Sequence, residues 1–311
     1  MKERETYIDI AKGIGIILVV IGHLHGINHI IHDFFYLFHM PLFFIISGYL
    51  YNHNNIIPLK TFIKHKIKRL IIPFLFFWLG PCLILSTRLN NPLKYDWFSW
   101  VTHESFFDSP IWFLWVLFGV CLIFKFITRY KITICSLLAI TTYYIGTRFH
   151  IPLFIDTIFL CLFYYSIGNA FRNHLRDILQ LSSKTYYWIA FILLAAQVIF
   201  EKSQINYRSF EFENINMITL VTCAILGSYI TIVLSQKIHG IAAYILTFIG
   251  QNTMLIICTH TLFIHFLETI TTKYYNLGNH PHIIFLLLIP IYIFLIPLSN
   301  RYLTFLFGGK K

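Results

Sequence analysis

Charged side chains are scarce in this sequence. Only 12% of its 311 residues are Asp, Glu, Lys or Arg, whereas a soluble globular domain carries about 25%. Hydrophobic residues make up 57% of the chain. This balance excludes an ordinary soluble domain and predicts an all-α, polytopic integral membrane protein whose spans are long apolar helices.

Acidic residues are the scarcer of the two signs, 13 against 24 basic ones, which gives a formal net charge of +11. Such an excess can indicate a nucleic-acid partner. If the N-terminus is cytoplasmic, however, most of the basic residues fall in the inner segments between the predicted spans, as the positive-inside rule requires. We therefore predict cytoplasmic N- and C-termini, a multi-pass location in the cell inner (plasma) membrane, the lipid bilayer as a partner, and no nucleic acid.

The sequence also lacks the spacings of a disulfide or zinc framework. Its six cysteines all fall inside apolar runs, where core packing is the expected role. The N-terminus has no small-residue cleavage site, and its first apolar run contains Asp9 and Lys12. We therefore expect a retained first helix and no removed signal peptide.

About ten apolar stretches approach the roughly 20 residues that a bilayer span requires. They cover residues 8–27, 33–51, 68–87, 110–128, 132–148, 152–170, 186–201, 216–235, 241–268 and 282–306. We expect residues 1–311 to form one membrane domain with no extra-membrane catalytic domain. A homo-oligomer is compatible with this sequence.

Two ionisable residues in the first predicted span point to a function. Lys12 and His23 are eleven residues apart, or about three helical turns, so both side chains face the same way, roughly 16 Å apart along the axis. Ionisable groups inside a membrane span are costly and usually functional. This spacing places a cation near one membrane face and a base close to the other.

The same region carries a resemblance to a known family. The motifs are Asp9-x-x-Lys12, His23, His39-Met-Pro-Leu-Phe-Phe and Phe43-Phe44-x-x-Ser47-Gly48-Tyr49. They resemble the opening of the acyltransferase-3 family, integral membrane enzymes that O-acylate carbohydrates. Two features are similar to the branch labelled fucose 4-O-acetylase-like. They are the His39 segment and the lysine at position 12, where most members carry arginine.

This resemblance implies a membrane O-acetyltransferase. It would move an acetyl group from acetyl-CoA to a hydroxyl of a cell-surface glycan or its lipid-linked precursor, of the exopolysaccharide, capsule or O-antigen type. Histidine suits the role of general base because its ordinary pKa is about 6.5. We expect His23 in that role, supported by His260 or His39, with Lys12 holding the coenzyme or pairing with Asp9.

His260 follows a Gly-Gln-Asn-Thr cluster at residues 250–253. Small and polar residues inside an apolar run predict a local helix break or a close helix contact. A late membrane histidine after such a cluster also resembles the family. Taken alone, one histidine in a span is as well explained by a hydrogen bond in the core.

Two loops supply the predicted substrate contacts. The basic segment 52–73 contains Lys66 and Arg69, which we expect, with Ser47, to hold the coenzyme; a solvated loop that binds anionic lipid explains the same charges. The aromatic and acidic segment 88–109 leads to Trp112 and contains Glu104 and Asp108. These three suit a sugar, although an interfacial aromatic belt is the simpler explanation.

Three alternatives to direct acyl transfer were compared, and the first two stay open. A covalent relay would carry the acetyl group on His23, Ser47 or Tyr49. A secondary transporter would also use intramembrane Lys and His residues, but we find no inverted repeat. A metal site among the histidines at 23–39 is not expected, because His23 and His25 would lie about 200° apart on one helix. We expect no metal.

Overall fold

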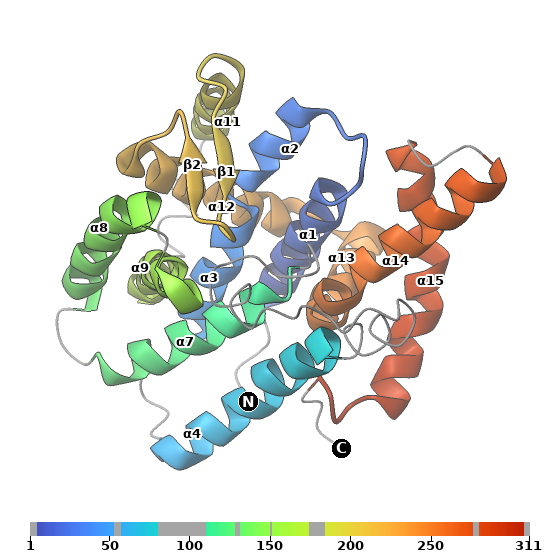
Figure 1. Ribbon diagram of the computed structural model, residues 1–311, viewed down its shortest axis with the longest axis horizontal. Helices are drawn as coiled ribbons and strands as arrows, with labels where there is room; N and C mark the ends of the chain where they lie inside the picture. The colour runs from blue at the N-terminus through green and yellow to red at the C-terminus, as the bar shows by residue number, and fades with distance from the viewer. Residues whose placement is uncertain are drawn as a thin grey trace.

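The structure is a computed structural model that describes residues 5–52, 57–79, 110–127, 131–149, 151–173, 184–275 and 280–307. Within these ranges the chain is a helical bundle with one small β-hairpin at one end (Figure 1). Helices dominate because apolar segments in a bilayer must satisfy their backbone hydrogen bonds internally. The expected all-α class is confirmed.

The helices run in chain order as follows. They are α1 (Thr6–Gly22), α2 (His29–Tyr36), α3 (His39–Leu50), α4 (Leu59–Lys66), the π-helical η1 (Ile67–Ile71), α7 (Trp112–Phe126), α8 (Lys131–Phe149), the 3-10 turn η2 (Pro152–Phe154), α9 (Ile155–Ala170), the 3-10 turn η3 (Phe171–Asn173), α11 (Lys184–Ile199), α12 (Met217–Lys237), α13 (Gly240–Gln251), α14 (Thr253–Tyr275) and α15 (Pro281–Tyr302). Six segments in the described part of the chain are long and apolar enough to cross a membrane. The chain is therefore a multi-pass membrane protein.

Two predicted spans are interrupted. Residues 33–51 divide into α2 and α3 at a turn over residues 37–38, and residues 241–268 divide into α13 and α14 at Asn252. The second interruption confirms the break predicted from the Gly-Gln-Asn-Thr cluster. At residues 37–38 the apolar run continues across the turn, so hydropathy alone does not reveal the first interruption.

The first span is shorter than predicted. Residues 8–27 were expected to be helical, but α1 ends at Gly22, and His23 is its C-cap residue with φ −99° and ψ 1°. The chain then turns through Gly26, whose φ of +80° favours glycine. His23 therefore lies at the helix end, where its ring reaches a cavity, and not inside a continuous span.

Glycines bring α1 and α13 into backbone contact. A Cβ atom added at Gly13 would lie 2.2 Å from the carbonyl oxygen of Leu246, and one at Gly250 would lie 1.8 Å from that of Asp9. Neither distance leaves room for a methyl group, so only glycine permits this approach. The close helix contact predicted at residues 250–253 is confirmed, and it fixes α1 beside the break at Asn252.

Replacing Gly250 with alanine is expected to destabilise the protein. The added methyl group must push α1 and α13 apart, and overpacking of this kind costs about 1–3 kcal/mol. Thermal unfolding of the purified protein in detergent measures the loss. Gly119→Ala is the matched control, because the atoms nearest to its added Cβ belong to the flexible Ile158 side chain, Cδ1 at 2.8 Å, and not to the backbone. Equal melting temperatures for the two variants would contradict the contact.

The β-hairpin covers one end of the bundle beside α2 (Figure 1). Its strands β1 (Gln204–Asn206) and β2 (Glu211–Glu213) pair antiparallel, with Ile205 opposite Phe212. Tyr207 and Phe210 in the connecting turn are buried. The hairpin is therefore anchored by its apolar turn, while its polar strand residues stay available to a cavity below it.

Candidate active site

Two cavities lie along the same three helices. We call them the histidine cavity, of about 290 Å³, and the basic cavity, of about 520 Å³. Both cavities are lined by residues from α3, from α7 and from α1 or its C-cap residue. The histidine cavity takes His23, His39 and Trp112 from them, and the basic cavity takes Lys12, Ser47 and Leu117.

The histidine cavity gathers side chains from five segments. Its lining is His23, His32, Asp33, Tyr36, His39, Met40, Pro110, Trp112, Gln204, Ile205, Asn206, Tyr207, Arg208, Glu211 and Glu213. Tyr36 lies at the centre of its aromatic wall, stacked on His32 with ring centroids 4.0 Å apart and edge-on to His39 at 4.7 Å. The cavity therefore combines imidazoles with aromatic faces and carboxylates.

The three histidines named from the sequence share one hydrogen-bonding pattern. Nδ1 donates to the carbonyl oxygen four residues earlier, at 2.8 Å in His23, 2.7 Å in His39 and 2.8 Å in His260. A carbonyl oxygen only accepts, so Nδ1 carries the proton in each neutral ring. Nε2 is left with a lone pair, which is the form a general base requires.

His260 lies directly behind His23. Their ring centroids are 5.1 Å apart and the rings are nearly perpendicular, at 88°. His260 is fully buried on α14, and its Nε2 has no hydrogen-bond partner in the part of the chain that the structure describes. A buried nitrogen with a lone pair can accept a hydrogen bond from a neighbouring donor.

Sugar-compatible groups surround these imidazoles. Trp112 presents an aromatic wall, and Asp33, Glu211 and Glu213 supply carboxylates that can accept hydrogen bonds from hydroxyls. Tyr207, in the hairpin turn, lies 3.3 Å from the hydroxyl of Tyr164. Burial raises the pKa of the Tyr207 phenol well above its ordinary value, so it stays a neutral donor.

The basic cavity lies near the N-terminal half of α1. Three cations named from the sequence, Lys12, Lys66 and Arg69, line it together with Ser47. Amide and hydroxyl groups at the break between α13 and α14 and from the end of α15 complete the lining. They are Gln251, Asn252, Thr253, Ser299, Asn300 and Thr304. A cavity with three cations and many neutral donors suits a polyanion such as a phosphorylated coenzyme.

Lys12 is held in place by a buried partner. Its Nζ lies 2.6 Å from Oδ1 of Asp9, one helical turn away, and Asp9 is only 3% exposed. Gln251 donates to the other carboxylate oxygen at 3.4 Å. Because Asp9 neutralises part of the charge, Lys12 is positioned at the cavity wall without an isolated charge in the core.

The structure brings together several of the residues named from the sequence. Glu104 and Asp108 lie outside the described residues. The other named catalytic and coenzyme candidates line the two cavities or, for His260, lie behind one of them. Tyr49, the third candidate for a covalent relay, lines neither cavity and donates a hydrogen bond to Glu5 at 2.6 Å. Their roles in a reaction stay predictions. The sequence analysis did not assign Asp33, Tyr36 or Gln251 to a site. The only indication that each one gave was a polar group next to an apolar run.

The comparison with protein families identifies one family for nearly the whole chain. The model of the Acyl_transf_3 family, described as an acyltransferase domain, matches residues 5–299. A nodulation protein NolL from Mesorhizobium japonicum is 31% identical over 143 residues, which are 41% of this chain and 37% of that protein. Its namesake from Sinorhizobium fredii is 33% identical over 147 residues, 42% and 38% of the two chains. The matches span less than two fifths of these relatives, and no solved structure matches significantly.

Proposed function

Because the chain belongs to the acyltransferase-3 family and is a membrane O-acyltransferase, we propose that it moves an acetyl group from acetyl-CoA to a hydroxyl of a cell-surface glycan or its lipid-linked precursor. One observation supports this proposal above the others. A cavity with a basic imidazole and a cavity with three cations lie along the same three helices. An acyltransferase needs such a pair of sites, one for the proton of the acceptor and one for the donor.

The basic cavity is the donor site in this proposal. Lys66 and Arg69 would bind the phosphates of the coenzyme, and Lys12 would lie closer to the pantetheine arm. Lys12 and His23 are about 16 Å apart along α1, a distance that the arm would span to bring its thioester to the imidazole. The phosphates would enter from the cytoplasmic side of the inner membrane, as the predicted topology requires.

The histidine cavity is the acceptor site. Its carboxylates and its Trp112 wall suit a sugar ring, which offers hydroxyl donors and apolar C–H faces. The acceptor is of the exopolysaccharide, capsule or O-antigen type.

The reaction follows from the hydrogen bonds of His23. Its Nε2 takes the proton of the acceptor hydroxyl as the hydroxyl oxygen attacks the thioester carbonyl. The C–S bond of the tetrahedral intermediate then breaks, and the imidazolium returns the proton to the departing coenzyme A sulfur. The Nδ1–H bond to Val19 keeps the ring in the required tautomer, and His260 supports the transient positive charge. This sequence of steps uses no metal.

Purified protein tests the proposal directly. In detergent or vesicles, acetyl-CoA and a surface-glycan acceptor should give free coenzyme A and an O-acetylated glycan in equal amounts. Release of coenzyme A without a modified glycan would contradict the assigned acceptor class. Labelled acetyl-protein that accumulates without acceptor, and then transfers its label, would replace direct transfer with a relay through a protein side chain.

Replacing Arg69 with alanine is expected to weaken donor binding. A hydrogen bond to a charged group contributes about 1.5–3 kcal/mol, so the KM for acetyl-CoA should rise roughly tenfold to a hundredfold while kcat changes little. The measurement is a donor titration with acetyl-CoA and with its analogue lacking the 3′-phosphate. The variant should discriminate less between the two donors than the parent protein. Lys60→Ala, on the exposed start of α4 outside the cavity, is the control; an unchanged KM in Arg69→Ala would contradict the donor site.

A further inference from the structure

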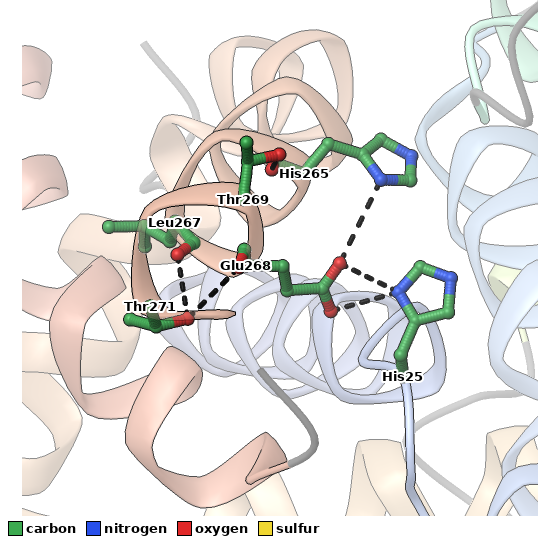
Figure 2. Close-up of polar contacts among 6 residues, drawn as sticks. All are labelled: His25, His265, Leu267, Glu268, Thr269 and Thr271. Atoms are coloured by element: carbon green, nitrogen blue, oxygen red, sulfur yellow. Dashed lines mark hydrogen bonds and ion pairs between the residues drawn. The ribbon is translucent and has the colours of Figure 1, made fainter. Parts of the chain in front are cut away.

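A second cluster of chemistry-bearing side chains lies outside both cavities. His25, from the turn after α1, meets His265 and Glu268 of α14 (Figure 2). His25 Nδ1 lies 2.8 Å from each carboxylate oxygen of Glu268, and His265 Nδ1 lies 3.8 Å from one of them. We call these three residues the outer cluster.

Local structure holds the outer cluster together. His265 and Glu268 are three residues apart on α14, so they project from one helix face. His25 lies in the turn over residues 23–26 that follows α1. Thr271 donates to the backbone carbonyls of Leu267 and Glu268, at 2.8 and 3.2 Å (Figure 2). Two elements that are far apart in the sequence therefore converge on one carboxylate.

The three side chains form the ligand set of a transition-metal ion. Two imidazole nitrogens and a carboxylate oxygen lie within 4.8 Å of one another. Tetrahedral Zn²⁺, with bonds of about 2.0–2.2 Å, requires ligand atoms about 3.4 Å apart. Small rotations of two half-exposed rings bridge this difference. We propose that the outer cluster binds one zinc-class divalent cation, with water at the fourth position.

The exposure of the three groups fits this assignment. The imidazole side chains are 61% and 53% exposed, whereas the Glu268 side chain is only 14% exposed. An ion can therefore reach the nitrogens from solvent and meet a carboxylate that is already fixed. It would displace the proton that His25 shares with Glu268, as metal binding to imidazole generally does. Imidazole ligands favour zinc-class ions over Mg²⁺ and Ca²⁺, which prefer oxygen.

The ion would stabilise the neighbouring histidine pair. His25 follows His23 by two residues, and His265 follows His260 by five. A metal bound between His25 and α14 therefore ties together the two segments that bring those rings to 5.1 Å. It takes no part in acyl transfer, and the assignment does not depend on the donor or the acceptor proposed above.

Metal binding by the purified protein tests the assignment. The protein, isolated through a tag without histidine and treated with EDTA, is titrated with Zn²⁺ by calorimetry and with Co²⁺ by visible absorption. We expect one Zn²⁺ per chain, a raised melting temperature, and a Co²⁺ spectrum of low coordination number. Glu268→Gln and His25→Asn should each weaken Zn²⁺ binding at least about tenfold, since even second-shell changes cost that much. Mg²⁺ should neither bind nor compete.

His282→Asn is the matched control. His280 and His282 form another exposed imidazole pair, with ring centroids 5.5 Å apart against 5.6 Å in the outer cluster, but they are not part of a three-ligand group in the part of the chain described. This variant should keep the parent affinity. Absence of saturable Zn²⁺ binding, or equal affinities in Glu268→Gln and the parent, would overturn the assignment and leave the cluster an ion pair only. His25 lies in an exposed turn, so His25→Asn still gives a test if a helix variant fails to fold.

Discussion

Replacing His23 with alanine is expected to lower acyl transfer by about 10²–10⁴-fold, the usual contribution of a general base. The variant loses the imidazole that lines the histidine cavity. It should still insert and bind acetyl-CoA, because the basic cavity lies three turns away along α1. Initial rates with saturating donor and acceptor, together with a melting curve, measure the two effects separately.

His29→Asn is the control for this experiment. His29 begins α2 and is exposed, at the same end of the bundle but outside the cavity lining. It should keep the parent rate. A His23→Ala protein with full activity, or one that loses activity only because it unfolds, would rule out His23 as the base.

Removing the charge of Lys12 is expected to have the second large effect. Lys12→Met leaves Asp9 buried without its ion pair, and breaking a buried pair from one side costs about 3–5 kcal/mol. The variant should therefore melt at a much lower temperature and should also lose donor affinity. Lys12→Arg keeps the charge beside Asp9 and should retain most of both properties.

A double variant separates the two roles of Lys12. Asp9→Asn combined with Lys12→Met removes both charges, so most of the lost stability should return. Donor affinity should not return, because the cation is still missing from the basic cavity. If the double variant binds acetyl-CoA as the parent does, Lys12 has only a structural role and the donor site depends on Lys66 and Arg69.

Periodicity and charge predicted much of this molecule. Apolar runs located the helices, and the polar cluster at residues 250–253 predicted both a break and a close contact. The eleven-residue spacing predicted Lys12 and His23 about three turns apart, and in the structure Lys12 lines the basic cavity while His23 lines the histidine cavity. These features are local, so one segment of sequence contains the whole signal.

Contacts between distant segments could not be predicted in this way. The pairing of His23 with His260, and of His25 with Glu268, depends on how α1 packs against α13 and α14. The hairpin over the histidine cavity was not predicted, because residues 202–215 fell between two predicted spans. The predicted end of the first helix, at residue 27, lies five residues beyond its observed end at Gly22. Hydropathy did not reveal the turn that follows Gly22.

The two cavities share α1, α3 and α7, and this arrangement has a consequence for the proposed reaction. If the donor and the acceptor bind as proposed, neither the nucleotide nor the sugar would have to cross the bilayer, because only the acetyl group would pass from one cavity to the other. Such a transfer would not need the rocking of domains that a carrier requires.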